Sequence, residues 1–141
     1  TGKLSIPSSY VTGTQGVYTI TISTALASGE TMTVDGISYT PAEADTTASA
    51  QATALKATLE ANATFASKYT ITRNSGALTL KEKVGKYGTG APTVVTTGLS
   101  TGVVTTATTT AGVAGHTGTI TVTATSIFNS SVSGTATVTV A

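Results

Sequence analysis

Apolar and hydroxyl side chains alternate along much of this 141-residue chain. The first such segment, Val17–Thr24, places Tyr and Ile on one side of an extended backbone and Val and Thr on the other. A repeat of two predicts strands with one buried face, because successive strand side chains point to opposite sides. About one residue in four is Thr, whose β-branched side chain favours strands. We expect a mainly β, antiparallel protein.

A tight hairpin is predicted around Asp35–Gly36. This pair lies between two short alternating segments, which is the arrangement of a two-residue type I′ turn. With the pair at the tip, Val34 lies opposite Ile37 and Met32 lies opposite Tyr39. All four apolar side chains then share one face, so the turn and the hydrophobic pattern predict the same register.

One helix is predicted after this hairpin. The segment Asp45–Thr47 supplies N-cap candidates. Apolar residues then recur three or four positions apart, as on one helix face: Ala48, Ala52, Leu55 and Leu59. We predict a helix from about Thr47 to Ala61 that ends near Asn62. Its narrow, Ala-rich stripe allows close approach to a sheet.

A second hairpin is predicted over Tyr69–Leu80. Its loop is Asn74–Gly76, with Gly76 in the left-handed conformation. The next segment, Lys81–Pro92, has too many glycines for a regular element and is expected to be an exposed loop. A strand over Thr93–Thr97 is expected to return to the same sheet.

Beyond Gly98 the composition narrows to Thr, Val, Ala, Gly and Ser. Thr119–Thr125 and Thr135–Val140 alternate cleanly and are predicted to pair, in a third hairpin or across two sheets. Val103–Thr109 and Leu4–Ile6 are weaker strand candidates.

We divide the chain at residue 98. Residues 1–97 form a hairpin, helix and hairpin module with N-terminal strands, and residues 98–141 form immunoglobulin-like strands rich in Thr and Val. An immunoglobulin-like sandwich usually takes ~100 residues, so the C-terminal part is too short to be complete. We expect it to pack on the first part, or to be completed by that part or by a neighbouring subunit. The predicted fold class is mainly β with one α-helix (α+β).

The order of these elements resembles a known kind of module. Gly29–Thr40 (GETMTVDGISYT), the Ala-rich helix, Tyr69–Thr72 (YTIT), Gly76–Leu80 (GALTL) and a Gly-rich loop are similar to small modules in structural proteins of tailed bacteriophages and in bacterial surface-layer and adhesin-like proteins. The likeness covers Gly29 to Thr97. It implies scaffolding or display, with no catalytic residues to carry over.

The C-terminal strands carry a second resemblance. Gly118–Ser126 and Ser133–Val140 resemble the last two strands of bacterial immunoglobulin-like domains. Those domains decorate phage particles and bacterial surfaces, so this resemblance implies the same class of function as the first.

Composition excludes several function classes. Charged residues make up 9% of the chain, against roughly 25% in an ordinary soluble domain, and the formal net charge is +1. No basic stripe is available for nucleic acid, and no apolar segment is long enough to span a bilayer. The chain has no Cys and one His, which leaves little for thiolate, zinc or triad chemistry. We expect no catalytic residues and no cofactor.

One loop is a candidate contact for a partner. Tyr87 lies close in sequence to Lys83 and Lys86, and an aromatic ring beside mobile cations suits an acidic or glycan surface. The glycines around it resemble a phosphate-binding loop only superficially, because the Gly-Lys-Ser/Thr ending and a following helix are missing. A solvated loop is the simpler interpretation of this segment.

Two further groups are weighed as sites and not adopted. His116 lies among glycines, where a histidine is most often solvated. Asp35, Glu43 and Asp45 are near one another in sequence and could bind calcium, yet Asp35 already has a turn role and Asp45 a capping role. We therefore expect no metal site.

The sequence predicts a non-enzymatic structural protein of a multimeric assembly. Strand edges without lysines favour association by strand addition or sheet packing, so we expect a homo-oligomer that also contacts other structural proteins. A virion component such as a capsid decoration (cement) or tail protein is favoured, and a domain of a surface-layer or adhesin protein at the bacterial cell surface is the alternative. A carbohydrate-binding module stays open, and needs an exposed platform from among Tyr10, Tyr18, Tyr39, Tyr69 and Tyr87.

Overall fold

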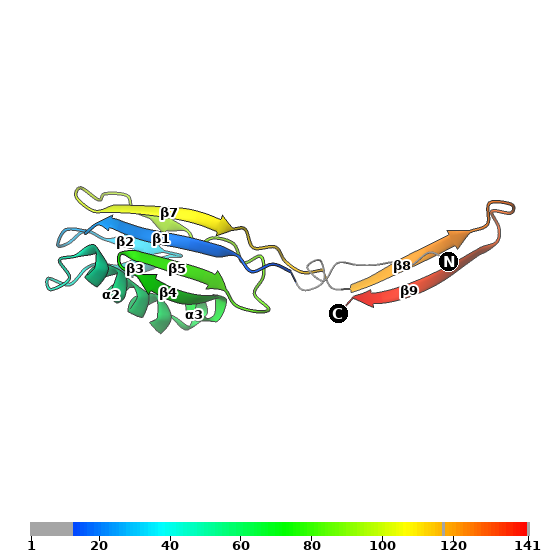
Figure 1. Cartoon of the computed structure of the whole chain (residues 1–141), viewed down its shortest axis with the longest axis horizontal. Coiled ribbons are helices and arrows are strands. Elements are labelled where there is room, and N and C mark those ends of the chain that lie inside the picture. The colour runs from blue at the N-terminus through cyan, green and yellow to red at the C-terminus, as the bar shows by residue number, and fades with distance from the viewer. Residues whose placement is uncertain (1–12, 117, 141) are drawn as a thin grey trace.

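The computed structural model describes residues 13–116 and 118–140. It is mainly β with one main α-helix, and the strand pairs are antiparallel, which confirms the predicted fold class. Residues 13–116 form a layered body, and residues 118–140 form a hairpin that extends beyond one end of it (Figure 1). We call these parts the body and the distal hairpin.

A four-stranded sheet forms one layer of the body. Its strand order is β4-β5-β1-β7, with β4 at Tyr69–Asn74, β5 at Ala77–Glu82, β1 at Val17–Thr24 and β7 at Val103–Thr110. Tyr18, Ile20 and Ile22 of β1 face the core and are at most 3% exposed, as the alternation predicts. The weaker strand candidate Val103–Thr109 is confirmed as β7, which pairs with β1 along its length.

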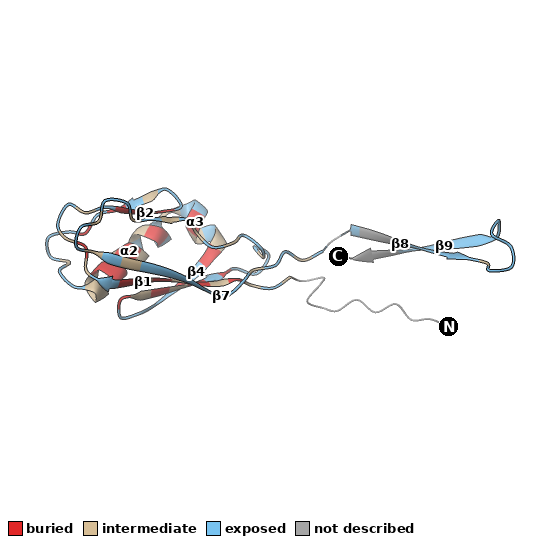
Figure 2. Cartoon of the chain, turned by 90° about the horizontal axis from the view of Figure 1, so that it is seen from above, coloured by how far each residue is buried: buried red, intermediate tan, exposed pale blue. Residues whose placement is uncertain are grey.

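A small sheet of order β3-β2-β6 and two helices cover the inner face of the large sheet (Figure 2). β2 (Met32–Val34) and β3 (Ile37–Tyr39) pair in the predicted register. Asp35 and Gly36 have φ angles of 48° and 77°, both in the left-handed region that a type I′ turn requires.

The predicted helix is α2, Ala48–Ala61. The Thr47 side chain caps it by accepting a hydrogen bond from the Ala50 N–H (3.1 Å). The leucines of its stripe are fully buried against the sheet. Gln51, also buried, accepts from the Leu26 N–H and donates to the Leu26 carbonyl, both at 2.8 Å, so it ties the loop after β1 to the helix.

A second short helix, α3 (Ala63–Lys68), is absent from the sequence prediction. Asn62, the predicted end of α2, also caps α3 by accepting from the Phe65 N–H (3.0 Å). The Phe65 ring is buried and lies 5.0 Å from the Tyr69 ring. Asn62 thus ends one helix and starts the next. A helix of six residues is unstable by itself, so the packing of Phe65 in the core stabilises α3.

Two local predictions are wrong. Ser75 and not Gly76 takes the left-handed conformation, with φ 53°. Gly76 is required because the backbone of Ile22 lies too close for a side chain: the Gly76 carbonyl accepts from the Ile22 N–H (2.9 Å), and a Cβ on Gly76 would overlap the Ile22 carbonyl oxygen. The strand expected at Thr93–Thr97 is the two-residue β6 (Val94–Val95), and it pairs with β2 rather than with the sheet of the second hairpin.

The distal hairpin consists of β8 (Gly118–Thr125) and β9 (Ser133–Val140), which pair directly. Among the described residues neither strand pairs with any other strand. Figure 2 shows buried residues only in the body, whereas the described side chains of the distal hairpin are mostly exposed. The other weak strand candidate, Leu4–Ile6, lies outside the described residues.

Candidate functional site

The distal hairpin exposes apolar surface that has no cover within the described chain. Val122 lies opposite Ala136 and is 42% exposed. On the other face Thr121 lies opposite Thr137, and Thr123 lies opposite Thr135. An isolated two-stranded hairpin is marginally stable at best in water, because it has no layer against which to bury its apolar side chains.

The tip of the distal hairpin presents two large apolar side chains. Ile127 is 91% exposed and Phe128 is 94% exposed. The turn beneath them is well bonded: the Ser126 Oγ accepts from the Phe128 N–H (3.2 Å), and the Asn129 carbonyl accepts from the Val132 N–H (3.0 Å). Side chains of this kind at a protruding tip are typical of a contact surface.

The segment that leads from β7 to the distal hairpin is fixed to the body. Thr14 and Val113 exchange two backbone hydrogen bonds of 2.8 and 2.9 Å. A Cβ on Gly13 would lie 2.6 Å from the Gly115 nitrogen, and a Cβ on Gly88 would lie 2.7 Å from the Ala114 nitrogen, so both backbones pack directly on this segment. We call residues 111–115 the exit segment.

Glu82 lies at the base of the exit segment and is fully buried. Three backbone N–H groups donate to its carboxylate, from Gly16 (2.9 Å), Gly88 (3.0 Å) and Gly90 (2.8 Å). The Tyr18 hydroxyl donates to the same carboxylate (3.2 Å) and accepts from the Gly112 N–H (3.2 Å). We call these six residues the Glu82 cluster: Gly16, Tyr18, Glu82, Gly88, Gly90 and Gly112.

The Glu82 cluster favours an ionised carboxylate. Burial by itself raises the pKa of Glu82, but the hydrogen bonds from the three glycines and from Tyr18 outweigh burial, so the pKa lies below its ordinary value. Burial also raises the pKa of Tyr18, and the nearby Glu82 charge adds to that effect. The carboxylate thus stays charged and the phenol stays neutral, which suits a fixed structural junction and not a proton-transfer pair.

A second carboxylate fixes the other end of β7. Glu30 accepts hydrogen bonds from the N–H groups of Ala27 (2.7 Å), Ser100, Thr101 (2.8 Å) and Gly102 (3.0 Å). The Thr101 and Ala27 bonds are the main cause that lowers the pKa of Glu30 to about 2, against the opposing effect of burial. The two carboxylates therefore hold the chain just before and just after β7.

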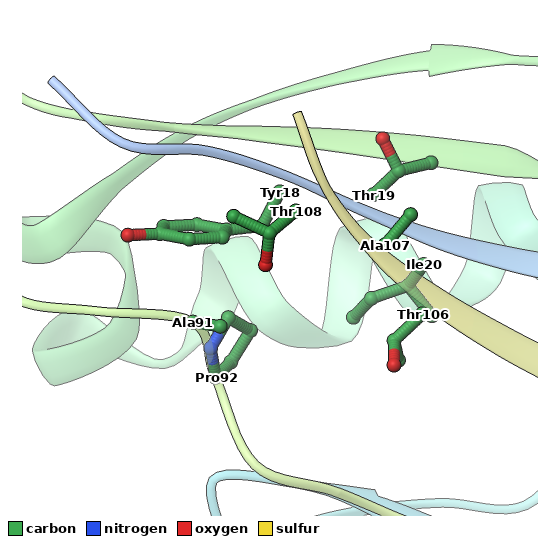
Figure 3. A pocket seen from close by; sticks show the side chains of 8 residues that line it. All are labelled: Tyr18, Thr19, Ile20, Ala91, Pro92, Thr106, Ala107 and Thr108. Atoms are coloured by element: carbon green, nitrogen blue, oxygen red, sulfur yellow. The ribbon is translucent and has the colours of Figure 1, made fainter. Parts of the chain in front are cut away.

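β7 is a free sheet edge next to a groove. Among the described residues it pairs only with β1, and most of its side chains are exposed. A groove of about 110 Å³ lies between β7, β1 and the segment before β6. Figure 3 shows Pro92 below the Tyr18 ring, with Ile20 and Thr106 on the same side of the sheet and Thr19 on the other.

Two other cavities lie on the body. One of about 270 Å³ lies between the loop after β1 and the segment that precedes α2, with Glu43 and Asp45 in its lining. Another of about 160 Å³ lies between the Asp35 turn and α3, beside Lys68. Nowhere in residues 13–116 and 118–140 do three His, Asp or Glu side chains gather as a metal site requires.

The predicted partner contact lies on the loop after β5. Lys83 and Lys86 are exposed, and Tyr87 is half-buried with its Cβ close to Gly13. The loop does not extend freely into solvent, because Gly88 and Gly90 donate to Glu82. That Lys83, Lys86 and Tyr87 contact a partner stays a prediction.

The other sequence candidates are dispersed. Asp35 accepts from the Thr93 N–H (2.8 Å) and lies 3.6 Å from the Lys68 Nζ, so it holds a turn, as predicted. Tyr18, Tyr39 and Tyr69 are buried in the core. Tyr10 lies outside the described residues.

Glu82 is the residue that the sequence prediction missed. The exposed loop predicted over Lys81–Pro92 is wrong at its start, because β5 continues to Glu82 and the Glu82 side chain is buried. Its signal is the alternation itself: Leu78, Leu80 and Glu82 share one face of β5. Two of the amides that bind it, those of Gly88 and Gly90, lie 6 and 8 residues further along the chain, and the third, that of Gly16, lies 66 residues before it, where no local pattern identifies it.

A scan against protein-family models and a search of curated proteins found no match to the chain. Within the described residues, no helix is both long enough and apolar enough to cross a membrane.

Proposed function

We propose that the protein is a non-enzymatic structural subunit that assembles with further copies of itself and with other structural proteins of a particle. One observation carries this proposal. The distal hairpin extends from the body with apolar side chains exposed, namely Val122, Val132 and the Ile127–Phe128 tip. Such a hairpin gains its stability only when another surface covers it.

The construction of the junction supports an assembly role. The Glu82 cluster and the Thr14–Val113 bridge hold the exit segment rigidly against the body. A base that is fixed as far as Gly115 restricts where the hairpin can lie, which lowers the entropy lost when it binds. The neutral composition of the distal hairpin fits a contact made by backbone pairing and apolar packing rather than by charge.

We further propose a virion component of a tailed phage, as a capsid decoration or tail protein, with a surface-layer or adhesin domain at the bacterial surface as the competing assignment. The resemblance of Gly29–Thr97 and of the C-terminal strands to modules of both groups supports this step. A carbohydrate-binding module is less favoured, because Tyr18, Tyr39 and Tyr69 are committed to the core and leave no exposed aromatic platform among them.

The test is the solution mass of the purified chain by light scattering over a wide concentration range. The proposal predicts a mass that rises above the 13.9 kDa monomer with concentration, or a discrete multimer. A strict monomer at every concentration, with no binding to phage particles or to cell-wall preparations, contradicts it. Binding to purified phage particles but not to cell walls supports the virion assignment, and the reverse supports the surface assignment.

A further inference from the structure

The free edge of β7 and the distal hairpin have matching properties. β7, β8 and β9 each have eight residues. No charged residue and no Pro lies in any of the three strands, so none carries the features that normally protect an edge. A strand of this length can exchange about eight backbone hydrogen bonds with an equally long antiparallel neighbour.

The opposite edge of the same sheet is different. β4 carries Arg73, whose guanidinium donates to the Ser75 carbonyl (2.9 Å) and to the Ser49 hydroxyl (3.1 Å). The strand has six residues, and its last three, Thr72–Asn74, are exposed and polar. A charged side chain at an edge discourages strand addition. Of the two edges, β7 is the one open to another strand.

The distal hairpin does not lie against the β7 edge of its own chain. The exit segment is fixed as far as Gly115 by its contacts with Thr14, Gly13 and Gly88. Only His116 and Thr117 separate Gly115 from the start of β8. Both views place the distal hairpin beyond the end of the large sheet and not beside β7 (Figures 1 and 2).

We propose that the distal hairpin of one copy adds to the free edge of β7 in a second copy and extends the order β4-β5-β1-β7 by its two strands. This inference rests on the proposed assembly function and names its interface. Backbone pairing along β7 supplies the affinity, and the groove beside Ile20, Pro92 and Thr106 receives a small aliphatic side chain from the added strand.

The contact is head-to-tail, since each copy donates a hairpin at one place and accepts one at another. Contacts of this kind generate a closed ring when the rotation closes and a filament when it does not. Either product buries the hairpin of every copy except at free ends.

Two variants separate the donor from the acceptor. Thr106→Lys places a charge at an exposed position of β7 that lines the groove, and so blocks the acceptor edge. Val122→Asp with Ala136→Asp places like charges directly opposite each other and disrupts the donor hairpin. Thr72→Lys, the same change at an exposed position of β4, is the matched control and is expected to assemble as the wild type does.

The experiment is sedimentation velocity on full-length chains, alone and mixed. Each blocked variant alone is expected to remain monomeric. An equimolar mixture is expected to form a one-to-one dimer of about twice the monomer mass, because the Thr106→Lys chain keeps a good hairpin and the doubly substituted chain keeps a good edge.

Three results overturn the inference. Assembly of Thr106→Lys at wild-type concentrations shows that β7 is not the acceptor. A mixture that stays monomeric shows that the contact is not head-to-tail. Loss of assembly in Thr72→Lys places the acceptor at the other edge. Equal thermal unfolding of the body in all variants, followed by circular dichroism, shows that none of these results comes from misfolding. A wild type that stays monomeric yet binds phage particles or cell walls overturns this inference alone. A wild type that stays monomeric and binds neither contradicts the proposed function itself, so the two failures are distinguishable.

Discussion

β1 in the body and β8 in the distal hairpin have nearly the same pattern, VYTITIST and GTITVTAT. In β1 the alternate Ile20 and Ile22 are 1% and 2% exposed, because α2 and the small sheet cover them. In β8 the equivalent Val122 is 42% exposed. Alternation therefore specifies a strand with one apolar face, but the covering layer decides whether that face is buried. In the assembly that we propose, the hairpin of β8 and β9 joins the sheet of a second copy.

The first prediction contrasts removal of apolar side chains in the two parts. Leu59→Ala, at a fully buried position of α2, is expected to lower the free energy of unfolding of the body by about 4 kcal/mol. Val122→Ala in β8 is expected to leave that free energy unchanged, because the body does not contact it. Urea unfolding at low protein concentration measures both. Equal destabilisation by the two changes would contradict the separation of body and hairpin.

The second prediction concerns the junction between the parts. Glu82→Gln is expected to cost about 3 kcal/mol, because an amide cannot accept the four hydrogen bonds of the buried carboxylate and its NH₂ would face other donors. Glu43→Gln, the same change at an exposed position, is the control and is expected to be neutral. Urea midpoints check both. A stable Glu82→Gln protein with an unchanged exchange rate at the Gly112 amide would show that the cluster does not hold the exit segment.

The third prediction compares one chemical change at two buried tyrosines. The Tyr39 hydroxyl is buried without a hydrogen-bond partner in the described structure, so Tyr39→Phe is expected to stabilise the body by about 1 kcal/mol. Tyr18→Phe removes the bonds to Glu82 and Gly112 and is expected to destabilise by about 1 kcal/mol. Thermal and urea unfolding of the two variants give the signs. A loss of stability in both would mean that the Tyr39 hydroxyl has a partner.

The fourth prediction concerns the pH dependence of the stability of the body. The pKa of Glu30 is about 2 in the folded chain, against 4.5 as the ordinary value. A lowered pKa contributes stability above the ordinary value, and this contribution is lost as the pH falls from about 4.5 to about 2. Acid titration of urea midpoints is expected to show this decline. Glu30→Gln is expected to reduce it, and the part that remains comes from Glu82, whose pKa is also lowered.

The assembly contact is expected to respond differently. β7 and the described distal hairpin contain no titratable side chain, so the strength of self-association at neutral and mildly acidic pH is expected to stay constant while the body remains folded. A steep pH dependence of the sedimentation coefficient in that range would point to a charged contact, such as the loop with Lys83 and Lys86.

Local sequence signals account for most elements of the body. The Asp35–Gly36 turn sets its own register. The Thr47 side chain caps the start of α2, and the backbone N–H of Asn62 donates to the Leu59 carbonyl at its end. The order of strands in the large sheet has no such signal, because β7 reaches β1 across most of the chain. α3 escaped prediction since six residues carry too little periodicity, and its position depends on the contact of Phe65 with the core.

The candidate site was predictable only in part. The low charge of the C-terminal strands indicates association, and the pairing of β8 with β9 follows from their alternation. The anchoring of the exit segment does not follow, because it depends on Glu82, whose backbone hydrogen-bond donors lie before β1 and after β5. The only signal for Glu82 in the sequence is its position: a carboxylate stands where the alternation of β5 calls for an apolar residue.

The most direct test of the central claim is amide hydrogen exchange of the full chain at two protein concentrations, one below and one above the rise in mass. The account predicts that amides of β7, β8 and β9 become protected at the higher concentration, while those of the β4 edge do not change. A rise in mass without added protection of β7 and the distal hairpin would contradict it.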